Sequence, residues 1–279
     1  VSCVAANLLG QGIAPGDRVG IWSPNNLQWV VSQFATARIG AILVNINPAY
    51  RGSELEFALR QVGCRALVFA AAVKGSDYGA MLCELLPEMA QARCGELCAA
   101  RLPELKLLVR LGSDATAGCL SFEDLKLAGR EAAGSTLQSI AAQLDPDQPF
   151  NIQFTSGTTG TPKGATLTHF GIVNNAYFIG EGLRLTAADR LCIPVPLYHC
   201  FGMVLGVLAA MTHGAASIFP GEGFDPLAVL ETVAKERCTV LHGVPTMFIA
   251  ELEHPRFGQF DLSSLRTGIM AGSPCPISV

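Results

Sequence analysis

The sequence contains few charged residues and no cluster of basic ones. Asp, Glu, Lys and Arg make up 15% of its 279 residues, against roughly 25% in an average globular protein. No run of lysines and arginines occurs, and the formal net charge is −4. Because nucleic-acid binding needs a basic surface, nucleic acid is excluded as the main ligand. The low charge and the mean hydropathy of +0.37 predict that much of the surface is buried against partners or missing parts.

Cysteines are too sparse for a disulfide scaffold, and their spacing does not fit a zinc site. The ten cysteines are scattered along the chain, whereas disulfide-rich secreted domains are shorter and denser in cysteine. Cys94 and Cys98 are the closest pair, but no histidine or second cysteine pair lies at zinc-ligand spacing from them. We therefore predict no metal site in this chain and expect reduced, mostly buried thiols.

No apolar segment is long enough to cross a membrane as a helix. The segment between Arg190 and Glu222 contains no Asp, Glu, Lys or Arg, but prolines and histidines interrupt it. Its uninterrupted apolar part, 201–211, is about half of the roughly 20 residues that a span requires. Gly202 and Gly206 form a G-x-x-x-G pattern, which here predicts a buried helix with close backbone packing. No targeting segment is visible at the start, and the missing initiator methionine suggests a processed or truncated chain.

Residues 155–164 read TSGTTGTPKG, a run of glycines and hydroxyl side chains closed by a lysine. Gly157, Gly160 and Gly164 lack a Cβ, so the backbone can adopt positive φ and bring its N–H groups close to an anion. The serine and threonines add hydroxyl donors, and Lys163 adds a flexible positive charge. Ser, Thr and Gly also cluster in ordinary loops, so composition alone leaves that alternative open. The order of the residues favours a phosphate-binding loop.

Strand-like segments flank this loop on both sides. Residues 150–154 and 165–168 have the pattern of strands, so the loop is expected to connect a hairpin rather than a strand and a helix. A Walker-type loop places glycine directly before its lysine and serine or threonine directly after it. Here Pro162 and Gly164 flank Lys163. The sequence therefore argues against a Walker-type nucleotide-binding protein.

The segment 154–169 resembles the phosphate-loop signature of the adenylate-forming superfamily. This superfamily contains acyl-CoA synthetases, firefly luciferase-like enzymes and the adenylation domains of peptide synthetases. Further segments resemble the medium-chain branch of the acyl-CoA synthetases, in particular the animal mitochondrial family member 2 group and its bacterial relatives. These segments are 151–154, 172–177, 196–200, 243–248 and 271–274. The resemblance extends over nearly the full length of the chain.

The resemblance implies an enzyme that activates a carboxylic acid with ATP and Mg²⁺ to an acyl-adenylate, and then forms the thioester with coenzyme A. Its loop is implied to hold the β- and γ-phosphates of ATP and to neutralise developing charge. The residues assigned to this loop are Thr155, Ser156, Gly157, Thr158, Thr159, Gly160 and Lys163. A merely solvated loop lysine is the alternative for Lys163.

Three further segments receive roles from the resemblance. His199 matches the motif residue beside the acyl carboxylate, where a neutral imidazole can donate a hydrogen bond; a histidine satisfied in the core is the alternative. Residues after a predicted strand are implied to form a wall of the acyl tunnel, or else to pack in the core. These are Gly243, Val244, Pro245, Thr246 and Met247. The segment implied to lie against the acyl-adenylate is Gly272, Ser273 and Pro274. The remaining histidines, His169, His213, His242 and His254, receive only packing or surface roles.

Predicted strands and helices alternate along the chain, which indicates an α/β fold. We expect layered, mainly parallel sheets with flanking helices, similar to the large N-terminal domain of acyl-CoA synthetases. The expected strands are 18–22, 41–44, 65–69, 105–110, 150–154, 165–168, 191–194, 216–219, 239–242 and 266–270. We expect a first subdomain over 1–149, irregular from 71, and a second over 150–279 that opens with the phosphate loop and is truncated at its C-terminal end.

Several helix boundaries also follow from the sequence. Ser53 and Glu56 predict a capping box that starts a helix. Asp225, followed by a proline, predicts the start of another helix. A helix is also expected over 81–94. No helix follows the strand predicted at 266–270, so one apolar face of its sheet is expected to be uncovered.

Motifs that the family places beyond this segment do not occur in the chain. They include an aromatic-Gly-x-Thr-Glu motif with a magnesium-binding glutamate, a Thr-Gly-Asp motif, and a small C-terminal domain with the adenylation lysine. We therefore expect the N-terminal portion of a medium-chain fatty acyl-CoA ligase, inactive by itself. The alternatives are an aryl- or amino-acid-adenylating enzyme, a non-catalytic nucleotide- or acyl-binding paralogue, and a Walker-type kinase.

The same resemblance sets the expected partners and cell compartment. The expected partners are fatty acid, ATP, coenzyme A and the missing C-terminal region. No nucleic acid is expected among them. The resemblance implies an intracellular protein, in the mitochondrial matrix if it is animal and in the cytoplasm if it is bacterial.

Overall fold

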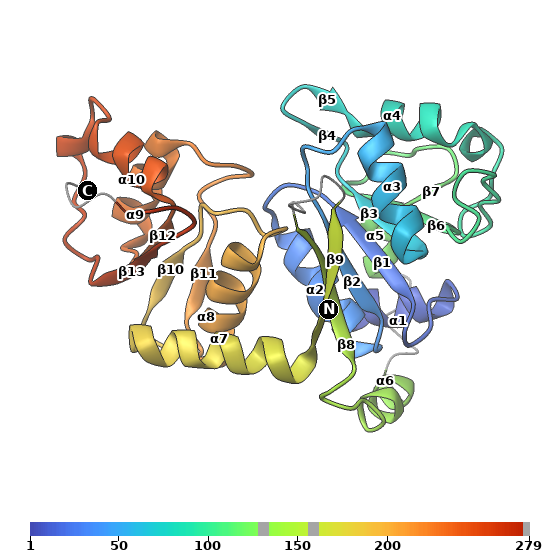
Figure 1. Ribbon diagram of the computed structural model, residues 1–279, viewed down its shortest axis with the longest axis horizontal. Coiled ribbons are helices and arrows are strands. Elements are labelled where there is room, and N and C mark those ends of the chain that lie inside the picture. Colours follow the sequence, from blue (N-terminus) through green and yellow to red (C-terminus); the bar gives the residue numbers. More distant parts are fainter. Residues whose placement is uncertain (128–133, 156–161, 276–279) are drawn as a thin grey trace. The chain divides into compact units, whose positions relative to one another are not determined.

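The computed structural model describes residues 1–127, 134–155 and 162–275. The chain divides into two compact units, Val1–His169 and Phe170–Val279. Each unit has its own sheet with helices packed beside it (Figure 1). Most neighbouring strands are parallel, and this confirms the α/β class predicted from the sequence.

The first unit is built on a seven-stranded sheet with the order β7-β6-β3-β1-β2-β8-β9. Its strands are β1 Arg18–Trp22, β2 Ile42–Ile46, β3 Cys64–Phe69, β6 Leu107–Arg110, β7 Cys119–Ser121, β8 Pro149–Thr155 and β9 Lys163–Thr168. All neighbours are parallel except β8 and β9. A separate hairpin is formed by β4 Ala72–Val73 and β5 Ser76–Asp77. The β8–β9 hairpin therefore forms one edge of this sheet.

Helices of the first unit pack close to the sheet where small residues allow it. They are α1 Ser2–Gly10, α2 Leu27–Arg38, α3 Gly52–Val62, α4 Tyr78–Leu85, α5 Phe122–Leu127 and α6 Gly134–Ala141. A Cβ added at Gly20 of β1 would lie 3.0 Å from the Ile46 side chain and 3.3 Å from Leu59 of α3. Glycine at this position therefore lets α3 approach the sheet closely.

Two predicted helix boundaries in the first unit are wrong. The predicted capping box of Ser53 and Glu56 does not start α3; instead, the Glu54 carboxylate accepts the Arg51 backbone N–H at 2.9 Å at the start of this helix. The helix expected over 81–94 is instead α4, followed by a 3₁₀ turn at Pro87–Ala90. A proline has no N–H to continue an α-helix, so α4 ends before it.

The boundary between the compact units lies after the β8–β9 hairpin, whereas the boundary expected at 149 lies before it. The reason is the pairing of β8 with β2, in which Leu43 lies opposite Asn151 and Asn45 opposite Gln153. This pairing makes the hairpin part of the first sheet. The two described ends of the phosphate-loop motif, Thr155 and Lys163, therefore belong to the first unit.

The second unit has a four-stranded parallel sheet with the order β11-β10-β12-β13. Its strands are β10 Arg190–Cys192, β11 Ala216–Ile218, β12 Val240–Gly243 and β13 Thr267–Met270. Its helical segments are α7 His169–Leu183, a π-helix at Phe201–Leu208, α8 Ala209–Thr212, α9 Pro226–Glu236, α10 Pro245–Leu252 and a 3₁₀ turn at Phe257–Gln259. As predicted, the Asp225 side chain caps α9 by accepting from the Ala228 N–H at 2.8 Å.

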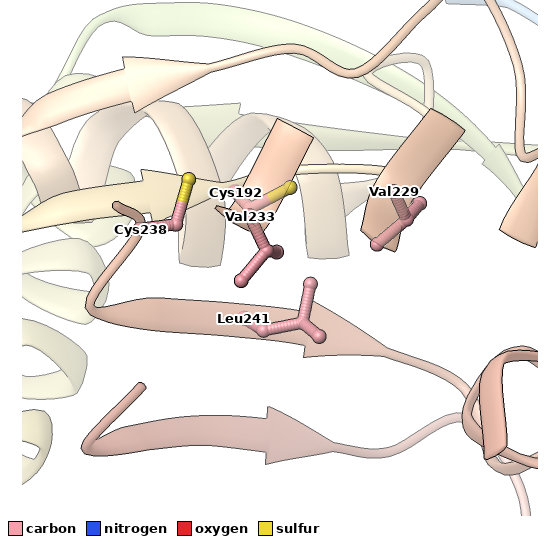
Figure 2. Packing of buried hydrophobic residues seen from close by; sticks show 5 residues of the cluster. All are labelled: Cys192, Val229, Val233, Cys238 and Leu241. Carbon is pink, nitrogen blue, oxygen red and sulfur yellow. The ribbon is translucent and has the colours of Figure 1, made fainter. Parts of the chain in front are cut away.

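A small apolar core lies between α9 and the sheet of the second unit (Figure 2). Its buried members are Cys192, Val229, Val233, Cys238 and Leu241. Cys192 and Cys238 are free thiols within this core, but the prediction that the thiols are mostly buried is wrong, because only three of the ten cysteines are buried and four are exposed. The interaction with the neighbouring Cys238 thiol, together with burial, raises the pKa of Cys192 far above its ordinary range.

The predicted helix over 202–211 is a π-helix at its start and an α-helix only from α8 onward. Gly202 packs directly under the Pro196 carbonyl, which leaves no room for a Cβ. Gly206 packs on the Ile193 side chain, where a Cβ would lie 3.1 Å away. The close backbone packing predicted from the G-x-x-x-G pattern is thus confirmed. Over the described residues, no helix has both the length and the apolar character needed to cross a membrane.

An ion pair between the buried Asp189 and the more exposed Arg266 links β13 to the loop before β10. The Arg266 guanidinium binds both carboxylate oxygens of Asp189, with Nε–Oδ1 and Nη2–Oδ2 distances of 2.9 and 2.7 Å. Asp189 also accepts from the Thr239 hydroxyl and from the Thr186 backbone N–H. These bonds hold the pKa of the Asp189 carboxyl far below its ordinary value. Arg266 also donates to the carbonyls of Leu183 and Arg184, so one side chain joins the sheet to the end of α7.

Candidate active site

The β8–β9 hairpin brings together the two ends of the predicted phosphate loop. Thr155 and Lys163 are the last paired residues of the hairpin. The Thr155 hydroxyl donates to the Lys163 carbonyl at 3.4 Å, and both residues are exposed. The expected hairpin connection is confirmed. The central loop residues Ser156, Gly157, Thr158, Thr159 and Gly160 lie outside the described residues.

A buried amide pair anchors the strand that leads into the loop. The side-chain amide of Asn151 donates to the Leu43 carbonyl at 2.8 Å and to the Asn45 side-chain oxygen at 2.9 Å. Both asparagines are almost completely buried, so these bonds form where water competes little. They fix β8 against β2 four residues before Thr155. Neither asparagine was predicted to be a site residue, although an asparagine within an otherwise apolar strand is a usable signal.

His199 lies in the turn that leads into the π-helix of the second unit. Its Nδ1 accepts the Phe201 backbone N–H at 3.1 Å, so in the neutral imidazole the proton resides on Nε2. Desolvation lowers the pKa of His199 below its ordinary value of 6.5. The residue is nevertheless exposed overall. His199 thus presents a neutral imidazole with a fixed Nε2–H donor at physiological pH.

His242, which received only a packing role from the sequence, connects β12 to the π-helix. It is fully buried, and its Nε2–H donates to the Leu205 carbonyl at 3.0 Å. Its ring lies 5.6 Å from the Phe201 ring, centroid to centroid. Burial lowers the pKa of His242, so it too is neutral at physiological pH. Through Phe201, His242 supports the turn that orients His199.

The predicted tunnel wall lies at the carboxyl end of β12, where open parallel sheets present ligands. Gly243 ends β12, and Pro245 is the first residue of α10. A Cβ at Gly243 would lie 2.9 Å from the Phe248 ring, so a side chain there would force this ring to shift. Val244 and Met247 are partly buried, and Thr246 is exposed.

The segment predicted to lie against an acyl-adenylate is adjacent to this wall. It follows β13, which pairs with β12. The Ala271 N–H donates to the Gly243 carbonyl at 3.2 Å. Gly272 has φ +95°, and a Cβ there would lie 3.1 Å from the Val244 side chain. Ser273 and Pro274 follow and are exposed. The structure therefore brings two of the predicted segments together in the second unit.

Metal ligands were not predicted in this chain. Across residues 1–127, 134–155 and 162–275, no three His, Cys, Asp or Glu side chains are grouped to hold a metal ion. We therefore assign no Mg²⁺ ligand to a described residue.

Comparison with known proteins identifies the family. The family model described as AMP-binding enzyme matches residues 1–279. The chain belongs to this family. The resemblance to the adenylate-forming superfamily is thereby confirmed.

Related sequences place the chain near acyl-CoA synthetases. The chain is 50% identical over 275 residues to YngI of Bacillus subtilis, an acyl-CoA synthetase by name. This match covers 99% of the chain and 50% of that protein. It is 48% identical over 281 residues to the mitochondrial medium-chain acyl-CoA ligase ACSF2 of Danio rerio, covering 100% of this chain and 46% of that protein. The chain thus spans about half the length of these relatives.

A solved structure supports the fold in the same way. The anthranilate CoA ligase AuaEII, in complex with anthranoyl-AMP, matches with a TM-score of 0.81 and 27% identity. The match covers 99% of this chain and 49% of that structure. The predicted likeness to the N-terminal domain of acyl-CoA ligases is confirmed.

Proposed function

We propose that the complete protein is a fatty acyl-CoA ligase of medium-chain type. The main support is the closed hairpin that joins Thr155 to Lys163 at the phosphate-loop motif, in a chain that belongs to the AMP-binding enzymes. The names of two similar relatives, acyl-CoA synthetase and medium-chain acyl-CoA ligase, support the subclass. Because this chain spans about half of those relatives, the tests below use the complete protein.

The proposed reaction requires residues that bind the phosphate groups of ATP. A thiol cannot readily displace oxide from a carboxylate. A carboxylate oxygen therefore attacks the α-phosphorus of ATP, the α–β phosphoanhydride bond breaks, and pyrophosphate leaves. The thiol of coenzyme A then attacks the acyl carbon and AMP leaves. Lys163 and the loop donors hold the departing phosphates and stabilise the charge that develops on them.

His199 is proposed to orient the acid. Its Nε2–H is free to donate to a carboxylate oxygen because Nδ1 is engaged by the Phe201 N–H. A neutral donor positions the carboxylate without an ion pair that would reduce the nucleophilicity of its oxygen. We propose that the acyl chain and the adenylate contact Gly243 to Met247 and Gly272 to Pro274. The donors of the loop suit phosphate. Mg²⁺ and coenzyme A complete the proposed reaction, and we assign no described residue to either.

Replacement of the loop lysine tests the assignment. In the complete protein, Lys163→Ala and Thr158→Ala are each expected to lower acid-dependent ATP–pyrophosphate exchange by about tenfold or more, or about 1.4 kcal/mol of barrier. Lys126→Ala is the control, because Lys126 is exposed on α5 and pairs only with Glu123. Unchanged exchange in both loop variants would contradict the phosphate-loop proposal.

Replacement of His199 tests the orienting role. His199→Phe is expected to lower exchange by about tenfold or more, because a hydrogen bond to a charged group is lost. His199→Gln retains an N–H donor and is expected to recover part of the activity. His254→Phe is the matched control, because His254 Nδ1 also accepts the N–H of the second residue after it, at 3.2 Å. Equal losses in the phenylalanine and glutamine variants would argue against hydrogen bonding by His199.

An aryl acid is the second candidate substrate, because the structural match contains anthranoyl-AMP. Exchange measured with octanoate and with anthranilate separates the two. Faster exchange with anthranilate would overturn the medium-chain assignment. Absence of exchange with any acid, together with ATP binding, would instead indicate a non-catalytic paralogue.

A further inference from the structure

The second unit contains a cavity that the proposed reaction does not use. Its volume is about 250 Å³, and it lies between α9, α10, β12 and the segment leading to β13. Its walls are mostly apolar side chains, among them Val229, Leu241, Phe248 and Met270. None of the proposed tunnel residues, 243–247, lines it. The cavity is therefore distinct from the proposed acyl and phosphate contacts.

One ionisable side chain interrupts this apolar lining. Glu251 of α10 lines the cavity, and only 4% of its surface is exposed. Within the described part of the chain, its carboxyl group has no hydrogen-bond or ion-pair partner, and no Lys or Arg lines the cavity. Burial raises the pKa of Glu251 to about 7, from an ordinary value of 4.5. Near neutral pH this carboxyl group is thus poised to ionise when a cation approaches.

The chemistry of this cavity selects its ligand. A buried carboxylate needs a positive charge with N–H donors, because desolvation without a partner is costly. The apolar walls favour a hydrocarbon body, and an apolar cavity of about 150 Å³ is enough to hold benzene. An acid would place a second negative charge beside Glu251. We propose that this cavity binds a compact apolar amine, with its ammonium group paired to the Glu251 carboxylate.

Benzylamine is a suitable probe, and benzyl alcohol is its neutral counterpart of nearly the same shape. Both are titrated into the complete protein at pH 8 by isothermal titration calorimetry. We expect benzylamine to bind about tenfold more tightly than benzyl alcohol, because only the amine forms a charge-assisted pair. Equal affinity of the two compounds, or no binding of benzylamine, would overturn the proposal.

Variants of Glu251 test whether the carboxylate is the partner. Glu251→Gln keeps the shape of the side chain, and Glu251→Leu matches the apolar walls. Both are expected to bind benzylamine about tenfold more weakly or worse, while benzyl alcohol binding is retained. Glu253→Gln, an exposed change two residues along the chain, is expected to leave benzylamine binding unchanged. Full benzylamine affinity in Glu251→Leu would show that the amine binds elsewhere.

Proton release provides a readout that does not depend on the variants. At pH 7 about half of the Glu251 carboxyl groups carry a proton, because the pKa is about 7. Pairing with an ammonium favours the ionised form. Benzylamine binding at pH 7 is therefore expected to release about half a proton, measured by calorimetry in buffers of different ionisation enthalpy. Binding without proton release would contradict pairing at Glu251. Loss of acid-dependent exchange would bear only on the proposed ligase function.

Discussion

Replacing Arg266 by methionine is expected to lower the free energy of unfolding by about 2–3 kcal/mol, because Asp189 is buried but the Arg266 side chain is 39% exposed and water partly screens the pair. The substitution leaves the Asp189 carboxylate without its cation, and the Asp189 side chain is only 6% exposed. It also removes the donors to the carbonyls of Leu183 and Arg184 at the end of α7. Urea unfolding followed by far-ultraviolet circular dichroism measures the loss. This signal is preferred because both tryptophans, Trp22 and Trp29, lie in the first unit.

Arg237→Met is the matched control for this substitution. Arg237 also pairs with an aspartate, Asp261, but both side chains are more than 60% exposed. Exposed pairs contribute little because water and salt screen them, so this variant is expected to unfold at the wild-type urea concentration. Similar losses in the two variants would show that general surface charge, rather than the buried pair, causes the effect.

The Asp189–Arg266 pair also predicts how stability depends on acid. The pKa of Asp189 is lowered from its ordinary value of 3.8, first because the Arg266 guanidinium donates to the carboxylate. A group with a depressed folded-state pKa contributes stability that is present above its unfolded pKa and is lost as the pH falls toward the folded pKa. The difference between wild type and Arg266→Met is therefore expected to stay constant above about pH 5 and to shrink below about pH 4.

The regular elements were predictable because they depend on local patterns. β1 coincides with the predicted strand at 18–22, and α9 starts at the predicted Asp225 cap. The failures arise where tertiary packing overrides local preference. The 202–211 segment has helical composition, but its first part is a π-helix. Within this π-helix, Gly202 packs against the Pro196 carbonyl. Nothing within that segment alone specifies this geometry.

The candidate site was predictable from motifs only as separate segments. The contact of Ala271 with Gly243 depends on the order of strands in the sheet, which the sequence analysis did not derive. The partners of Asn151 lie more than 100 residues earlier in the chain. His242 and Glu251 were missed for a related reason. Each lies among apolar residues, and only the fold shows that His242 is hydrogen-bonded whereas Glu251 has no hydrogen bond among the described residues.

The second large effect on the free energy of unfolding is expected at Glu251, where the substitution is expected to raise it. Glu251→Gln is expected to stabilise the chain at pH 8 relative to wild type, because the amide carries no charge to desolvate. Burial raises the pKa of Glu251 from 4.5 to about 7. The folded state therefore binds the proton more tightly than the unfolded state. The resulting contribution to the free energy of unfolding is fully present below about pH 4.5 and is lost as the pH rises through about 7. At roughly 1.36 kcal/mol per pH unit, the loss amounts to about 3 kcal/mol.

Urea unfolding of wild type and Glu251→Gln at pH 4.5, 6, 7 and 8 measures this effect, without amine in the buffer. Across this pH range, the free energy of unfolding of the variant is expected to rise steadily relative to that of wild type, by about 3 kcal/mol in all. Glu253→Gln is the control, because its side chain faces solvent and no comparable gain is expected. A difference between wild type and Glu251→Gln that does not change with pH would mean that folding does not raise the pKa of Glu251. Addition of benzylamine at pH 8 is expected to reduce the difference in free energy of unfolding between wild type and Glu251→Gln. The reason is that pairing with the ammonium offsets the desolvation cost of the Glu251 carboxylate, which the variant does not have.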